Sequence, residues 1–456
     1  MAANLYLVIP MKKVTVIFCA LVVFYSQYIL AKVQYDITDP SIAATMGDLV
    51  LSANTIEIFW HSYNHPNRPI TPPQAMQKII DDALLAQHAR RTLPNDILNS
   101  TNKVGFANDV MQQDRATALI RKTYGKELIT EVKNLPQGIG SLYQFNNEIT
   151  ADKLAELMTL KSALMIEANP EQQTEAQKTI IATLNFSPAK LTTSAQQLTL
   201  WDIYRRQNVQ GRLAIHKADL NYLQGQVKQH VGALMVLAWA KKNISPTDYA
   251  AIKEILLNEQ HKIRLLESMG LHADVHDDNP ALREYAKNIS EEKIKHFYQT
   301  NKDEFAVVER VKARHIRVAS QKLADQVAAE IKAGLDFDVA IKKYSIADDK
   351  NDAIAGDLGW LKRSDKNRSW LHAIAFMQQA GKVSAPFRSP QNQGDIVYEI
   401  IFADDRIDGH LPYSDPTVRY EASRDIALKE LRQEFTTLQT TLRNNADIHL
   451  NKAALK

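Results

Sequence analysis

The sequence predicts an α+β protein with two parts: a helical domain built from both ends of the chain, and a small α+β module with a four-stranded, mainly antiparallel sheet. Apolar residues recur at helical spacing through residues 32–308 and again in 406–456, whereas residues 309–405 contain the alternating and continuous apolar runs typical of strands. Gly and Pro are scarce, at 15 and 16 of 456 residues, which excludes a turn-rich, all-β chain.

Composition narrows the class of protein further. Hydrophobic residues make up 45% of the chain and charged residues 23%, which is typical of globular proteins and excludes an intrinsically disordered chain. Lys and Arg number 55 against 52 Asp and Glu, a balance too even to indicate nucleic-acid binding. The single cysteine, Cys19, excludes a disulfide framework, a CxxC redox pair and a thiolate metal site. We therefore expect no cofactor, no metal and no nucleic-acid partner.

The N-terminus carries a targeting signal. Lys12 and Lys13 precede the almost wholly apolar segment 14–30, which is the order of charges and apolar residues in a secretory signal, and Ala31 is a candidate cleavage residue. Ile29, two positions before it, is not the small residue that cleavage prefers. An uncleaved anchor in the inner membrane, with the lysines inside, is the alternative.

Both alternatives for residues 1–31 place the rest of the chain outside the cytoplasmic membrane, in the periplasm or cell envelope. Met1 and Met11 are both candidate start residues, because the lysine pair directly follows Met11. No later apolar run reaches the roughly 18–20 residues that span a bilayer.

Helix-starting signals punctuate residues 32–308. Thr71 is followed by two prolines and by Gln74, which is the pattern of a capping box with Pro in the first turn. Ser245 before Pro246 and Ser290 before two glutamates predict two further helix starts. The apolar stripes that follow are most simply core faces, and a groove that holds unfolded chains is the alternative.

Residues 309–405 read as the α+β module. The segment 311–318 alternates, with Val311, Ala313 and His315 on one face of the predicted strand and Ile316 and Val318 on the other. The other predicted elements are helices at 323–331, 337–344 and 370–377, a turn at 356–360, and strands at 383–387 and 396–402.

The tail, 406–456, begins with a predicted linker at 408–412 and continues as a helix. Its apolar residues recur three and four positions apart, and a short strand-like segment follows at 448–450. A lone helix cannot bury such a stripe, so we expect it to pack on the N-terminal domain. The members of the stripe are Leu428, Leu431, Phe435, Leu438 and Leu442.

Five short motifs follow one another in 309–405: VKARHI at 311–316, AGLDF at 333–337, KYS at 343–345, GDLGW at 356–360 and AGKVSAP at 380–386. Together they resemble the parvulin-type (rotamase) peptidyl-prolyl cis-trans isomerases. The lead-in at 289–294 and 301–305 is similar to the helix before that module in exported foldases of the SurA, PpiD and PrsA kind.

The resemblance implies catalytic residues and a substrate pocket. His315 matches the first active-site histidine of the family, and Asp348 matches the acidic position that follows Tyr344 and Ser345. The positions that match the proline-binding pocket and its surroundings are Leu358, Asn367, Leu371, Ser389 and Ile396, of which Asn367 stands where Met is common and Leu371 where Phe is usual.

The last strand departs from the family. The family has glycine, an aromatic residue and a histidine there, whereas this chain has Gly394, Asp395 and Ile396. The family's second histidine, which fixes the orientation of the first, is therefore absent. The resemblance thus implies that isomerase activity is either weakened or lost. Each of these residues also has a purely structural alternative. His315 packs on a strand face without a role, Asp348 belongs to a solvated loop, and Leu358 and Leu371 belong to the core.

Two functions follow from the resemblance. The first is an exported peptidyl-prolyl isomerase and foldase that binds unfolded polypeptides containing X–Pro bonds and assists the folding of envelope or secreted proteins. The alternative is a non-catalytic periplasmic holdase or secretion accessory factor on a degenerate module.

The domains are then 1–31, signal or anchor; 32–308, client-binding; 309–405, isomerase-like; and 406–456, the C-terminal helix. A contact with the inner membrane through the N-terminal segment is the further expected partner.

Overall fold

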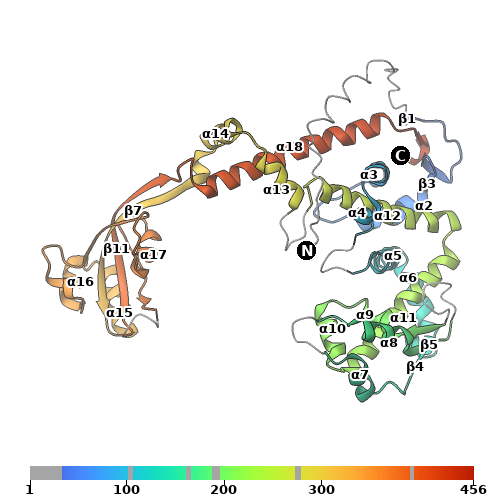
Figure 1. The fold of residues 1–456 in the computed structure, drawn as a ribbon, viewed down its shortest axis with the longest axis horizontal. Coiled ribbons are helices and arrows are strands. Elements are labelled where there is room, and N and C mark those ends of the chain that lie inside the picture. The colour runs from blue at the N-terminus through green and yellow to red at the C-terminus, as the bar shows by residue number, and fades with distance from the viewer. Residues whose placement is uncertain are drawn as a thin grey trace, which may run out of the picture. The chain divides into compact units, whose positions relative to one another are not determined.

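The computed structural model describes residues 33–100, 106–160, 166–186, 196–272, 279–390 and 395–455, and its fold is α+β (Figure 1). It contains two compact units. The helical unit comprises the described residues up to Ala281 and from Leu431 onward, and the sheet unit comprises Leu282–Glu430. The predicted signal or anchor at 1–31 lies outside the described residues, and none of the described helices is both long and apolar enough to cross a bilayer.

The helical unit begins its helices where the sequence predicts. The hydroxyl of Thr71 accepts a hydrogen bond from the Gln74 backbone, and the Gln74 side chain accepts one from the Thr71 backbone, which completes the capping box. Ser245 caps its helix with a single hydrogen bond, which its hydroxyl accepts from the Asp248 backbone. The helices are α2 (Ala53–Tyr63), α3 (Pro72–Thr92), α4 (Asn95–Leu98), α5 (Asn108–Thr123), α6 (Gly125–Lys133), α7 (Ala151–Met158), α8 (Pro170–Lys178), α9 (Leu200–Tyr204), α10 (Val209–His216), α11 (Leu220–Asn243) and α12 (Pro246–Ser268).

Two small sheets accompany these helices. One has the order β1–β12–β2–β3, in which β12 is parallel to β1 and antiparallel to β2, so strands from both ends of the chain form one sheet. The other is the antiparallel sheet β4–β5–β6. The sequence predicts β12 only, because strands this short carry too few residues to show a period. The strands are β1 (Val33–Gln34), β2 (Ile42–Met46), β3 (Leu49–Ser52), β4 (Tyr143–Phe145), β5 (Ile180–Leu184), β6 (Gln197–Thr199) and β12 (Ile448–Leu450).

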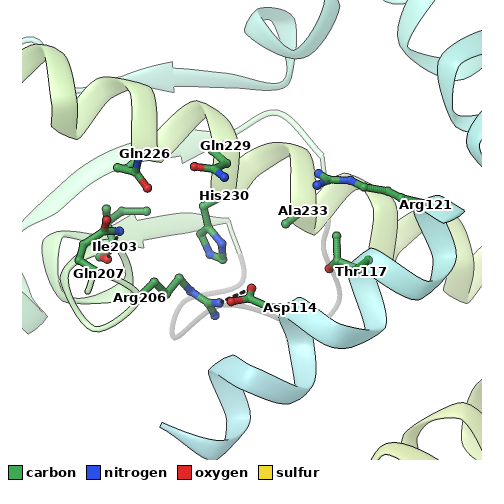
Figure 2. A pocket seen from close by; sticks show the side chains of 11 residues that line it. Asp114, Thr117, Arg121, Ile203, Arg206, Gln207, Gln226, Gln229, His230 and Ala233 are labelled. Atoms are coloured by element: carbon green, nitrogen blue, oxygen red, sulfur yellow. Dashed lines mark hydrogen bonds and ion pairs between the residues drawn. The ribbon is translucent and has the colours of Figure 1, made fainter. Parts of the chain in front are cut away.

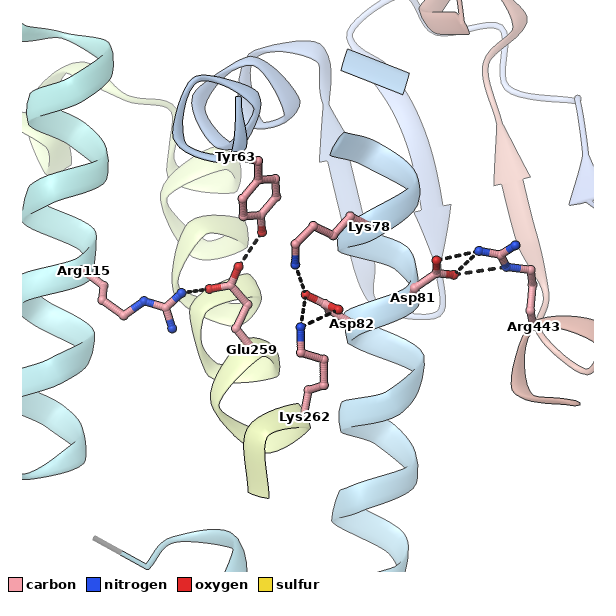
Figure 3. A network of polar contacts seen from close by, with 8 residues as sticks. All are labelled: Tyr63, Lys78, Asp81, Asp82, Arg115, Glu259, Lys262 and Arg443. Atoms are coloured by element: carbon pink, nitrogen blue, oxygen red, sulfur yellow. Dashed lines mark hydrogen bonds and ion pairs between the residues drawn. The ribbon is translucent and has the colours of Figure 1, made fainter. Parts of the chain in front are cut away.

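Two buried carboxylates cross-link the helices of this unit (Figure 3). Asp82 on α3 and Glu259 on α12 are each 5% exposed, and a buried charge requires partners. Both have them. Asp82 lies 2.5 Å from Lys78 Nζ and 2.9 Å from Lys262 Nζ, while Glu259 accepts a 2.5 Å hydrogen bond from the Tyr63 hydroxyl and pairs with Arg115 of α5.

The C-terminal helix α18 (Pro416–Asn444) contributes its second half to the helical unit. Phe435, Leu438 and Leu442 pack in one apolar cluster with residues of α3, α4 and α12. The guanidinium of Arg443 pairs with the carboxylate of Asp81 on α3 at 2.5 Å (Figure 3). Of the stripe read from the sequence, these three residues lie on the side of α18 that packs on α3.

The sheet unit is built on one antiparallel sheet of the order β10–β11–β7–β8, with β9 also paired to β11. It has five strands, one more than predicted, because Pro386 divides the predicted strand 383–387 into two short ones. The elements are α14 (Glu291–Thr300), β7 (Ala306–Val318), α15 (Gln321–Lys332), α16 (Phe337–Tyr344), β8 (Asp357–Lys362), α17 (Trp370–Phe376), β9 (Lys382–Val383), β10 (Phe387–Arg388) and β11 (Tyr398–His410), while α13 (Pro280–Lys287) spans the boundary between the units.

Three predicted boundaries differ from the structure. The segment 356–360, predicted as a turn, is mostly strand: only Gly356 turns, with φ +63°, and β8 begins at the next residue. The central strands are longer than predicted, since β7 begins at Ala306 and β11 continues through the predicted linker to His410. A long β7–β11 ribbon thus extends beyond the predicted module on both sides.

Helices cover both faces of this sheet. On one face, Ile316, Val318 and Ile400 pack beneath α15 and α16. On the other, Ala313 and Ile401 pack with residues of α17 and β8. Side chains alternate along a strand, so the second face also receives the odd-numbered residues of β7 and β11 that follow.

Candidate active site

His315 lies on β7, on the sheet face covered by α17. Its strand partner across the sheet is Ile401 of β11, and Ala313 and Arg317 are the neighbours on the same face. The side chain is 3% exposed. A histidine so deeply buried needs hydrogen-bond partners at its ring nitrogens.

Two carboxylates provide them, one on each side of the ring. Nδ1 lies 2.7 Å from Glu399 Oε2, and Nε2 lies 2.9 Å from Asp349 Oδ2. A neutral imidazole has a single N–H, so both contacts are hydrogen bonds only when the ring is protonated or one carboxyl carries the proton.

The network continues to a second cation. Arg317 Nε donates to Glu399 Oε1 at 2.6 Å, and the Glu399 carboxylate is fully buried. When the His315 ring is protonated, positive and negative groups alternate from Asp349 through His315 and Glu399 to Arg317. Burial alone lowers the pKa of His315, but the hydrogen bonds and charges of Glu399 and Asp349 outweigh it and raise that pKa above its usual value.

The backbone places Asp349 beside the ring. His315 N–H donates to the carbonyl of Gly356 at 2.9 Å, and Gly356 N–H donates to the carbonyl of Asp349 at 3.1 Å. A Cβ at position 356 would lie 2.5 Å from the His315 carbonyl oxygen, so only glycine allows this approach. The loop before it is tied to β7 as well, because the hydroxyl of Ser345 accepts a hydrogen bond from Arg317 N–H.

One atom of the network has no protein partner. Asp349 Oδ1 is buried and accepts no hydrogen bond from the described residues. The two carboxylates lie at opposite ring nitrogens and do not converge on one point, and no metal-ligand cluster occurs in the part of the chain that the structure describes. The site thus offers a fixed, charge-balanced network with one unpaired carboxylate oxygen.

Comparison with known proteins identifies the module. Residues 289–408 match the family model of the PPIC-type peptidyl-prolyl isomerase (PPIASE) domain. The chain carries a PPIC-type domain. The match includes β7 to β10, all of β11 except its last two residues, and the network around His315.

Curated relatives of the PPIC-type domain are foldases and chaperones by name. The chain is 29% identical over 185 residues to the foldase protein PrsA of Caldanaerobacter subterraneus, covering 40% of this chain and 57% of that protein. It is 34% identical over 115 residues to the chaperone SurA of Methylococcus capsulatus, covering 22% and 25%. It is 28% identical over 173 residues to the periplasmic chaperone PpiD of Haemophilus ducreyi, covering 38% and 26%. The chain thus spans between a quarter and somewhat more than half of these relatives' lengths.

Solved structures that it resembles carry similar names. PrsA of Bacillus anthracis is 19% identical, with a TM-score of 0.20 over 46% of this chain and 79% of that one. A structure described under the SurA-like chaperones PEB4 and Cj1289 of Campylobacter jejuni is 22% identical, with a TM-score of 0.21 over 57% and 98%. The identification of the PPIC-type domain rests on the family match.

The residues predicted from the sequence fall into three groups within the PPIC-type domain. Leu358 and Leu371 belong to the apolar cluster on the face of His315, together with Ile401, its partner across the sheet. Asn367 and Ile396 are exposed, the latter by 47%. Ser389 is buried, and its hydroxyl accepts a hydrogen bond from Val397 N–H at 3.0 Å, which closes the turn between β10 and β11.

The acidic partner of His315 is one residue further along than the sequence predicts. Asp348 is exposed in the short helical turn 348–351, and Asp349 is the residue that contacts the ring. The sequence offers three acids in this loop, and only the backbone conformation determines which one faces β7. Asp348 as the family's acidic position stays a prediction, and Asp349 is the acid that contacts His315.

Sequence reasoning also missed Glu399 and Arg317. Two signals were present. Glu399 is the single charged residue in an otherwise apolar strand (IVYEIIF at 396–402), and Arg317 lies two residues after His315, which places both on one face. An isolated acid in an apolar strand indicates a buried, paired carboxylate.

Proposed function

We propose that this protein is an exported foldase that isomerises X–Pro bonds in unfolded polypeptides. The PPIC-type domain is the isomerase, and the helical domain, residues 32–308 with 406–456, binds clients. One observation carries the proposal: His315 is held between Asp349 and Glu399, inside a PPIC-type domain, on the face that also carries Leu358 and Leu371.

Prolyl isomerisation needs no covalent step. Rotation about the X–Pro bond breaks amide resonance, at a barrier of about 18–20 kcal/mol. An apolar surface that holds the proline ring, beside polar groups that favour the twisted amide, lowers this barrier. An acceleration of about 10³–10⁴ corresponds to only about 4–5.5 kcal/mol of differential binding. Leu358 and Leu371 are the residues proposed to hold the ring, with Asn367, Ser389 and Ile396 bordering the bound segment.

The proposed location is the periplasm or cell envelope. The relatives include a protein named as a periplasmic chaperone and others named as foldases, and residues 1–31 have the charge and apolar pattern of an export signal. Cleavage would release the chain, whereas retention would anchor it to the inner membrane through residues 14–31.

A protease-coupled isomerisation assay on the full chain tests the enzyme. We expect H315A to reduce kcat/KM at least about tenfold, because the substitution removes the centre of the network. The matched control is H410A, which alters a histidine at the far end of β11. Activity of H315A equal to that of H410A contradicts the proposal.

The replacement of the family's second histidine favours a second candidate, a holdase without turnover. Its position has Ile396, and the partner of His315 is Glu399 instead. The holdase is supported if the full chain suppresses the aggregation of a chemically denatured client but shows no isomerase turnover above background. Unchanged suppression in H315A would then show that client binding does not use this site.

A further inference from the structure

The helical unit contains a polar pocket that the isomerase site does not use. It lies between α5 and α11, next to the turn that follows α9, and has a volume of about 250 Å³ (Figure 2). Its floor includes the buried residues Ile203 and Gln207. Both belong to the packed interior of the helical unit.

Several polar groups face this pocket without a protein partner. His230 is 8% exposed and forms no hydrogen bond with any described residue, and Figure 2 shows its ring directed into the space between α11 and α5. Arg206 Nε is buried and unpaired in the same part of the chain. The half-buried Gln226 and the exposed Gln229 add amides at the edge of the pocket. Buried polar groups are normally satisfied, so the unpaired His230 ring and Arg206 Nε together indicate a ligand.

The charges of the pocket specify an anion. Arg121 and Arg206 line it together with a single acid, Asp114, whose Oδ1 lies 3.6 Å from Arg206 Nη1. Burial lowers the pKa of His230 to about 3, so its imidazole is neutral and offers one donor and one acceptor. One positive charge remains in excess, which matches a carboxylate better than a doubly charged phosphate. Guanidinium groups recognise the planar carboxylate well.

An apolar groove adjoins the pocket. It lies along α6 and α11, has a volume of about 550 Å³, and shares Arg121 and Gln229 with the pocket as lining residues. Ile129 of α6, which lines it, is 56% exposed, an unusual exposure for a large apolar side chain. The other apolar lining residues are Leu128, Val132, Ile139, Met235 and Val236.

We propose that the pocket and the groove together bind the C-terminal end of an extended polypeptide with apolar final residues. The chain-end carboxylate pairs with Arg121 and Arg206 in the pocket, and the preceding side chains lie in the groove. A chain end fits both sites, because its carboxylate directly follows the apolar side chains that the adjoining groove would hold. The proposal is independent of the isomerase site.

Fluorescence anisotropy with the full chain tests it. The probe is fluorescein-labelled Gly-Ser-Leu-Val-Leu with a free C-terminal carboxylate, and its control is the same peptide with a C-terminal amide. Neither contains proline, so the result does not depend on isomerase activity. We expect the free acid to bind at least about tenfold more tightly, as a charge-assisted hydrogen bond provides.

Two variants and one competitor complete the test. R121Q is expected to remove the preference for the free acid, and I129D to weaken both peptides, whereas K126Q, an equal loss of charge on α6 outside the groove, leaves binding unchanged. Equal affinity for acid and amide, or a preference that survives R121Q, overturns the proposal. Competition by N-acetyl-leucine at the peptide's own affinity overturns it in favour of a free small acid.

Discussion

At the scale of single residues, acids organise the candidate active site of the PPIC-type domain. Glu399 is inaccessible to solvent, and its two oxygens contact His315 and Arg317 at 2.7 and 2.6 Å. It occupies a strand centre where an unpaired carboxylate would be strongly destabilising. Glu399 is therefore a positioning residue: it fixes the ring of His315 through Nδ1 and leaves Nε2 for Asp349.

The first prediction follows from this charge arrangement. In E399Q the shape of the side chain is nearly kept but its charge is lost, so we expect the pKa of His315 to fall towards its usual value. The raised folded-state pKa stabilises the protein fully below about pH 6.5, the unfolded value, and that stabilisation is lost as the pH rises through the folded pKa. In E399Q the stability lost over this pH range should be smaller. Titration of the His315 ring protons by NMR, with urea unfolding at several pH values, measures both.

E330Q is the matched control for this experiment. Glu330 carries the same substitution on α15, where its partners are Tyr344 and Lys343 and not His315. We expect the pKa of His315 to stay unchanged in E330Q. A His315 pKa that is identical in E399Q and the unsubstituted protein would show that Glu399 does not hold the ring.

The site was predictable to the level of its histidine. His315 and its strand face follow from alternation, and the apolar positions Leu358 and Leu371 follow from the family motifs. Asp349 could not be predicted in this way, because several acids lie close together in its loop and only the backbone conformation determines which of them contacts His315. Glu399 lies 84 residues from His315, and such a contact depends on the pairing of β7 with β11, which one sequence does not reveal.

At the scale of elements, the turn into β8 determines the position of the loop that carries Asp349. Gly356 adopts φ +63° and makes two backbone hydrogen bonds, one with His315 and one with Asp349. We expect G356A to destabilise the sheet unit by at least about 2 kcal/mol, since it combines a left-handed backbone with a clash against the His315 carbonyl. Urea unfolding and isomerase turnover measure the change.

G359A separates the two contributions. Gly359 has φ +65°, but a Cβ there would meet no heavy atom within 4 Å, so only the backbone cost of about 1 kcal/mol applies. An equal effect of the two substitutions would mean that the close approach to His315 is not what requires glycine at 356.

Elements were predictable where a local signal starts or sustains them. The capping box at Thr71 and the serine caps at Ser245 and Ser290 give helix starts that agree with the structure. Apart from β12, the strands of two to five residues in the helical unit carry no such signal, because their stability comes from partners far away in the sequence. β1 is an example, since its partners Ile448 and His449 lie near the other end of the chain.

At the scale of the whole molecule, the chain leaves the helical unit before the PPIC-type domain and returns to it afterwards. The return is substantial: α18 packs its apolar stripe on α3, and β12 lies between β1 and β2. The helical unit is therefore complete only when the last residues are in place. Folding of the N-terminal part has to wait for the C-terminal strand, a contact of very high sequence separation.

I448A tests this dependence. Ile448 is 3% exposed and packs in the main core of the helical unit, so we expect its truncation to destabilise that unit by about 2–4 kcal/mol. Hydrogen exchange should accelerate at the amides of β2 and α3, more than 350 residues earlier in the chain, while the amides of β7 and β11 keep their protection. The control I346A alters an isoleucine of the sheet unit that is 52% exposed and should change stability by less than about 0.5 kcal/mol. Faster exchange in β7 and β11 as well would show that the two units unfold as one, and unchanged exchange in β2 would show that the helical unit does not need its C-terminal strand.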